Sequence, residues 1–174
     1  ILGIVNDKNY QIIYSDTPGI IDPAYKMQEG MMKFVYTSLQ DADLILLLLE
    51  CGQKSLKDEK LQGFLSNSKV PVLVLLNKID LSNQEDLAVE VDRWQKELPR
   101  SEILAISALH DFNVDSLKKK IVDLLPESPA FYPKDTLTDK SERFFVEEKI
   151  REKILLLYEQ EVPYSTEIAV ESFK

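Results

Sequence analysis

Three short polar clusters in this chain have residue types and positions that could do chemistry. They are Asp16-Thr17-Pro18-Gly19, Asn77-Lys78-Ile79-Asp80 and Ser107-Ala108-Leu109. Each follows an apolar run that reads as a strand, and open α/β sheets bind ligands in the loops beyond the carboxyl ends of their strands. Taken singly, the first cluster is typical of a turn and the second of a solvent-exposed loop with a helix cap. The third cluster by itself predicts nothing. In this order, each ending a predicted strand, they predict one ligand site.

The second and third clusters suit the edge of a purine base. A carboxylate at Asp80 can accept two hydrogen bonds from adjacent N–H groups, which guanine presents and adenine does not, so the site would select guanine. Asn77 can donate and accept, which suits the N7 side of the base or the bracing of nearby loops. The aliphatic stem of Lys78 can cover the base plane. We expect the main-chain N–H groups of Ser107 and Ala108 to meet guanine O6.

The first cluster suits phosphate and metal. Asp16 leaves a strand where a hydrated Mg²⁺ would sit, so it is the candidate metal ligand, acting through water. Gly19 lets its main-chain N–H approach a γ-phosphate. The three clusters together therefore predict a guanine nucleotide, GTP or GDP, bound with Mg²⁺.

Such a site needs a sheet whose strand ends meet, and the apolar pattern predicts one. Continuous apolar runs at 44–49 and 70–76 are typical of strands buried on both faces, and 103–106 is a shorter strand. Helices are predicted between and around these strands, over 24–39, 56–65, 84–98 and 114–125. This alternation predicts an α/β fold with a mostly parallel sheet. Residues 1–6 and 10–15 predict a hairpin that adds one antiparallel edge strand.

Prolines divide the chain near residue 126. Pro126, Pro129 and Pro133 resist both helix and sheet, so an extended linker is predicted. We expect a first domain over 1–126, a linker over 127–140, and the N-terminal part of an incomplete second domain over 141–174.

The second domain is predicted to open with a helix. Asp139 and Glu142 have the spacing of a capping box with Asp139 at the N-cap, and Glu147 and Arg151 have the spacing of an ion pair one turn apart. A strand is expected over 166–174. One helix and one strand cannot enclose a core, so this pattern indicates the start of something larger.

Composition excludes several classes of protein. The chain has 174 residues, 44% of them apolar, and a net charge of -9, which argues against disorder and against nucleic-acid binding by the whole surface. The lone Cys51 cannot form an internal disulfide, which favours a reducing compartment and predicts a cytoplasmic protein. The longest apolar run is far shorter than the roughly 20 residues that span a bilayer.

The three clusters, in this order, resemble the third, fourth and fifth guanine-nucleotide motifs of the translation-factor-related GTPases. Asp16-Thr17-Pro18-Gly19-Ile20, as opposed to the Ras-type Asp-x-Ala-Gly-Gln, is similar to the Era-like branch. Residues 139–145, 150–153 and 162–165 resemble the entry into the KH domain of that branch. The resemblance covers essentially the whole chain. It implies a Ras-like P-loop GTPase sheet followed by the start of an α+β type II KH domain.

The resemblance also implies a function. It predicts a GTP-binding and GTP-hydrolysing protein that binds small-subunit ribosomal RNA and assists assembly of the 30S subunit through the KH domain. A monomer is expected, and association with the inner face of the cell membrane stays open. The residues of all three clusters, including Leu109, are the implied nucleotide-binding positions.

Two departures bear on activity. The phosphate loop G-x-x-x-x-G-K-[ST] does not occur in this sequence; in the family it lies upstream of Ile1, and the KH G-x-x-G loop would lie beyond Lys174. We therefore expect this chain, as a fragment, to bind GTP poorly and to hydrolyse none. Ile20 stands where Ras-like proteins carry a water-orienting Gln. A hydrophobic side chain cannot position water, so no catalytic residue is assigned and unaided hydrolysis should be slow.

Two alternatives remain open at this point. One is another Era-like GTPase with a different C-terminal domain. The other is a nucleotide-free interaction module, which the absence of a phosphate loop would suit. In that module the pairing of Asn77 with Asp80 would have no evident purpose.

Overall fold

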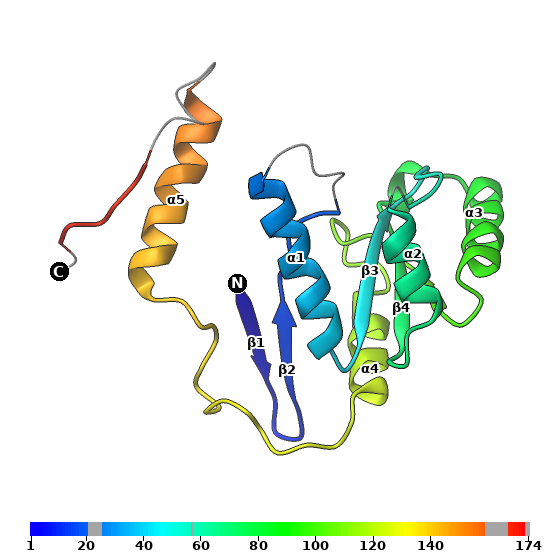
Figure 1. The fold of residues 1–174 in the computed structure, drawn as a ribbon, viewed down its shortest axis with the longest axis horizontal. Coiled ribbons are helices and arrows are strands. Elements are labelled where there is room, and N and C mark those ends of the chain that lie inside the picture. The colour runs from blue at the N-terminus through cyan, green and yellow to red at the C-terminus, as the bar shows by residue number, and fades with distance from the viewer. Residues whose placement is uncertain (21–25, 57, 159–166, 173–174) are drawn as a thin grey trace. The chain divides into compact units, whose positions relative to one another are not determined.

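The computed structural model describes residues 1–20, 26–56, 58–158 and 167–172, and its elements are labelled in Figure 1. The chain divides into two compact units, Thr17–Ala130 and Ile1–Asp16 with Phe131–Lys174. Each unit is described by itself below. The domain limits expected from the proline pattern stay a prediction.

The unit Thr17–Ala130 is built on a parallel sheet with the strand order β3-β4-β5. Its elements are α1 (Lys26–Asp41), β3 (Ile45–Glu50), α2 (Glu59–Ser66), β4 (Val72–Asn77), the 3-10 helix η1 (Ile79–Leu81), α3 (Gln84–Glu97), β5 (Glu102–Ala105) and α4 (Val114–Leu124). The predicted α/β class and parallel pairing are confirmed. Because parallel strands share a direction, the carboxyl ends of β3 and β4 finish side by side, with Glu50 opposite Asn77.

The larger apolar core of this unit lies between the sheet and the helices α2 and α3. Trp94 of α3 and Leu61 of α2 pack there against β3 and β4, and Trp94 is fully buried. A second cluster joins Leu73 and Leu75 of β4 to Leu117 of α4. Strand β4 is therefore buried on both faces, as its continuous apolar run predicts.

Strand β3 does not follow the same prediction. Its alternate residues Ile45, Leu47 and Leu49 are buried in the larger core, but Leu48 on the other face is 60% exposed. The prediction that β3 is buried on both faces is therefore wrong. An apolar run reports the residues available for burial, and the packing of neighbouring elements decides which are covered. Within the described ranges, no helix combines the length and apolarity needed to cross a membrane.

The second unit begins with the predicted hairpin, β1 (Leu2–Asn6) and β2 (Gln11–Ser15). We expected this hairpin to add an edge strand to the parallel sheet. Among the described residues, β1 and β2 instead form a two-stranded sheet of their own. The free edge of β1 pairs with the linker, because Gly3 forms a bridge with Thr138 and the Ile4 N–H donates to the Leu137 carbonyl at 2.8 Å.

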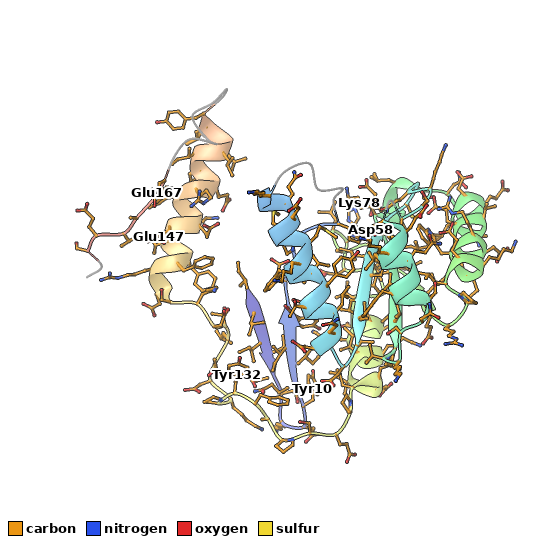
Figure 2. The ribbon with its side chains drawn as sticks, in the orientation of Figure 1. Tyr10, Asp58, Lys78, Tyr132, Glu147 and Glu167 are labelled. Atoms are coloured by element: carbon orange, nitrogen blue, oxygen red, sulfur yellow. The ribbon has the colours of Figure 1, made fainter. Side chains whose placement is uncertain are left out.

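The predicted extended linker is held along the hairpin. The Gln11 side chain accepts hydrogen bonds from the main-chain N–H groups of Phe131 and Tyr132, and its amide donates to the Tyr132 carbonyl at 2.9 Å. The side chains of Tyr132 and Tyr10 both lie beside the hairpin turn in Figure 2. Lys134 adds an ammonium contact to the Lys8 carbonyl. One glutamine thus fixes the start of this segment with three hydrogen bonds.

Helix α5 (Glu142–Leu157) follows the linker, and its start differs from the prediction. Ser141 is the N-cap and its hydroxyl accepts from the Phe144 N–H. Asp139 instead accepts from the Leu2 N–H at 2.9 Å. The expected capping box is therefore wrong, because the hairpin competes successfully for the Asp139 carboxylate.

The later part of this unit also departs from expectation. Arg151 pairs with Glu148 rather than with Glu147, whose carboxylate accepts from the Val170 N–H at 2.9 Å. Glu147 and the neighbouring Glu167 are labelled in Figure 2. Residues 167–172 run beside α5 without strand pairing, so the expected strand does not form there. The motif residues 162–165 lie outside the described residues.

Candidate functional site

The carboxyl ends of the parallel strands carry the second predicted cluster. Asn77 is the last residue of β4, and its carbonyl accepts from the Cys51 N–H just beyond β3 at 3.0 Å. On the other side, the Ile106 N–H donates to the Leu76 carbonyl at 2.8 Å. Main-chain hydrogen bonds therefore fix the loops that follow all three strands relative to one another.

Lys78 adopts a left-handed backbone conformation, with φ 63 and ψ 35. This conformation costs a non-glycine residue about 1–2 kcal/mol, and such strain is found mainly at functional sites. The Lys78 ammonium lies 3.0 Å from the Glu50 carboxylate, and both side chains are about half exposed. Figure 2 shows Lys78 at the end of the sheet where β3 and β4 finish.

Asp80 lies in η1 and is oriented by Ser107. The buried Ser107 hydroxyl donates to Asp80 Oδ1 at 2.5 Å. This hydrogen bond lowers the pKa of the Asp80 carboxyl and outweighs the smaller upward effect of burial; His110 and Lys78 act in the same downward direction. Asp80 is consequently an ionised acceptor at neutral pH. His110 is itself an exposed loop residue, with its Nε2 3.9 Å from Asp80 Oδ2.

Asn77 connects the second cluster to the third. Its Oδ1 accepts from the Ala108 N–H at 3.0 Å, so the expected bracing of neighbouring loops is present. The Ser107 N–H donates to the Phe112 carbonyl. Both N–H groups that we expected to meet guanine O6 thus have partners within the protein, and an O6 contact would have to share or replace them. Leu109 is 80% exposed.

The first cluster follows β2 directly. Asp16 belongs to the hairpin unit, where its N–H donates to the Ile1 carbonyl at 2.9 Å; Thr17, Pro18 and Gly19 belong to the parallel-sheet unit. A Cβ built on Gly19 would have no heavy atom within 4 Å, so packing within the protein does not demand glycine there. Ile20 packs against the larger core.

The structure thus brings together five of the predicted site residues. They are Asn77, Lys78, Asp80, Ser107 and Ala108. The sequence patterns do not single out Glu50, which contacts Lys78. Its position was the available signal, because it is a charged residue at the carboxyl end of a buried strand that neighbours β4.

This combination of fold and site defines a class of protein. Asn-Lys-x-Asp and Ser-Ala-Leu loops, linked by hydrogen bonds at the end of a parallel sheet, mark an α/β domain of the GTPase type. In agreement, the family model described as 50S ribosome-binding GTPase matches residues 1–78.

Individual relatives specify the family. GTPase Era of Clostridium novyi is 39% identical over 175 residues, which cover all of this chain and 60% of that protein. A protein named GTPase ERA-like, chloroplastic, from Oryza sativa is 40% identical over 178 residues, which cover all of this chain and 42% of that protein. A crystal structure of Era with MgGDPNP and nucleotides 1506-1542 of 16S ribosomal RNA has a TM-score of 0.84 and 36% identity, over 94% of this chain and 57% of that one.

Over its whole length the chain is similar to GTPases of the Era family. It spans 60% or less of the length of these curated relatives.

Proposed function

We propose that this chain supplies the base-binding part of a GTP-binding and GTP-hydrolysing protein. The observation that carries the proposal is the ionised Asp80 carboxylate, held by Ser107 beside Lys78. One Asp80 oxygen accepts from Ser107, and the remaining lone pairs can accept guanine N1–H and N2–H₂. Adenine would set an acceptor against this carboxylate and leave a charge unpaired.

Magnesium fits the residues present. The Era relative was crystallised with MgGDPNP. Among the described residues, no three side chains of His, Cys, Asp or Glu gather to hold a metal ion. Mg²⁺ binds one or two carboxylates, retains several waters and takes its other ligands from phosphates, so a single carboxylate such as that of Asp16 is the kind of protein ligand it takes. Asp16 is the residue that would hold the hydrated ion, and the ion would neutralise phosphate charge.

Hydrolysis would depend on groups other than the side chain after Gly19. Ile20 packs against the core, so it is unavailable to orient a water molecule. We expect slow GTP hydrolysis by the full-length protein. Residues 1–174 alone should bind GTP weakly, because the phosphate loop that holds the β- and γ-phosphates does not occur in this sequence.

The RNA-binding part of the proposal rests on similarity and on α5. The relative's crystal structure contains a segment of 16S ribosomal RNA. Helix α5 with the segment beside it is compatible with the start of a KH domain, and we propose that this domain binds small-subunit RNA and assists 30S assembly. We further propose that the full-length protein is a cytoplasmic monomer, and its association with the cell membrane stays open.

Nucleotide binding can be tested with a fluorescent GDP titrated into the full-length protein. We expect GDP to compete with the label and ADP to fail, and residues 1–174 to bind far more weakly. Equal competition by ADP would contradict the base-binding site.

RNA binding needs a separate measurement. A 16S fragment should bind the full-length protein but not a version that ends at Ala130, the last residue of the parallel-sheet unit. Equal affinity for the two proteins would contradict the KH proposal and leave the nucleotide site untouched.

A further inference from the structure

Glu50 contacts the lysine of the proposed base site from the neighbouring strand. Its carboxylate lies 3.0 Å from the Lys78 ammonium. Glu50 is the last residue of β3 and lies opposite Asn77, which precedes Lys78 in the chain. The Cys51 N–H, one residue beyond, donates to the Asn77 carbonyl at 3.0 Å. The main chains that carry the two charges are therefore fixed relative to each other.

The turn that follows Glu50 is also braced, from helix α3. Gly52 has a φ of 92, which favours glycine, and its N–H donates to Glu90 Oε1 at 2.5 Å. The Arg93 guanidinium donates to the Gln53 carbonyl, also at 2.5 Å. Since the strand before Glu50 and the turn after it are both held, the carboxylate is presented from a rigid backbone.

A lysine that covers a base needs its stem in one direction. An unrestrained lysine stem populates many rotamers, and ordering it costs free energy. Here the left-handed backbone of Lys78 fixes one end of the stem, and Glu50 holds the ammonium at the other end. A cleft of about 440 Å³, bordered by Glu50, Lys78 and Glu90, lies beside this contact and leaves the charged groups open to water.

We infer that Glu50 is a positioning residue for guanine-nucleotide binding, which acts by holding the Lys78 stem in its base-covering orientation. This inference rests on the proposed function. Because half-exposed ion pairs contribute modestly, loss of Glu50 should weaken GDP binding by about two- to fivefold. If Glu50 instead held Lys78 away from the base, loss of Glu50 would tighten GDP binding.

A double-mutant cycle in the full-length protein tests the inference. The dissociation constant of fluorescent GDP is measured for the parent, Glu50→Gln, Lys78→Met and the double variant. We expect Glu50→Gln to raise the constant about two- to fivefold when Lys78 is present and to leave it unchanged in the Lys78→Met background. Glu127→Gln is the charge-matched control. This substitution also removes one negative charge, but Glu127 is an exposed linker residue that forms no ion pair among the described residues. High salt should shrink the coupling.

The outcomes separate this inference from the proposed function. An equal effect of Glu50→Gln in both backgrounds would show that Glu50 does not act through Lys78, and tighter or unchanged binding would overturn the inference as well. In each of these cases the parent still binds GDP, so the proposed function stands. A parent protein that binds no GDP would refute the proposed function and this inference together.

Discussion

Replacement of Asp58 tests how helix α1 is held against helix α2. Its Oδ1 caps α2 by accepting from the N–H groups of Lys60 and Leu61, and its Oδ2 accepts from the Tyr36 hydroxyl of α1 at 2.7 Å. Burial, followed by the contact with Asp58, raises the pKa of Tyr36 to about 12, so the hydroxyl stays a donor at neutral pH. One carboxylate therefore joins α1 to α2.

The expected magnitudes follow from these two roles. Loss of a helix cap costs about 1 kcal/mol, and loss of one hydrogen bond costs about 1 kcal/mol more, so Asp58→Ala should lower the free energy of unfolding by about 2 kcal/mol. Tyr36→Phe should cost about 1 kcal/mol. The double variant should cost about 2 kcal/mol rather than about 3, because both changes remove the same contact. Asp58→Asn keeps an oxygen for the cap and should cost less than Asp58→Ala.

Urea unfolding, followed by the fluorescence of Trp94, measures these differences. Trp94 is the single tryptophan in the sequence and is fully buried in the core that α2 covers. Additive effects of Tyr36→Phe and Asp58→Ala would refute the link between the two helices. A loss below about 0.5 kcal/mol for Asp58→Ala would refute the cap as well.

Three further outcomes are expected. Ser107→Ala should raise the dissociation constant of GDP about tenfold in a fluorescence titration, because Asp80 loses its charge-assisted partner. In acid, the stability advantage of the parent over Asp58→Ala in urea unfolding should shrink. Burial raises the Asp58 pKa, but the hydrogen bonds from Tyr36 and from the α2 main chain together outweigh it, so the pKa is lowered. The stabilisation by the ionised carboxylate is therefore complete above the unfolded pKa of ~3.9 and is lost as pH falls through the folded pKa. Gln11→Ala should speed amide hydrogen exchange at Tyr132, whose N–H then loses its acceptor.

Each of these has a contrary result. An unchanged GDP constant for Ser107→Ala would mean that the hydroxyl does not orient Asp80. If the difference in free energy of unfolding between the parent and Asp58→Ala stayed constant from neutral pH to about pH 3, the lowered Asp58 pKa would be contradicted. Unaltered exchange at Tyr132 in Gln11→Ala would contradict the glutamine contact, and Gln53→Ala, outside the hairpin unit, controls for a general loosening.

Local patterns predicted the parallel sheet and the base-side cluster well. The continuous apolar run of β4 correctly predicts that this strand is buried on both faces. The carboxyl ends of parallel strands lie at the same edge of the sheet, so the loops that follow them are neighbours. Asn77 and Ala108, 31 residues apart, therefore come into contact as the motif order implies.

Competition between distant segments could not be predicted in the same way. Asp139 has the spacing of a helix cap, yet it binds the N–H of Leu2, 137 residues away, and Ser141 caps the helix instead. The contact between Glu50 and Lys78 depends on the register of β3 against β4, which spacing along one chain does not define.

Whether Asp80 selects guanine is tested by a competition between GDP and xanthosine diphosphate for binding to full-length Asp80→Asn. The asparagine amide donates where the carboxylate accepted, so it matches the carbonyl that xanthine carries in place of the guanine amino group. We predict that the parent prefers GDP and that Asp80→Asn prefers xanthosine diphosphate. An undiminished preference of Asp80→Asn for GDP would show that the Asp80 carboxylate does not determine base choice.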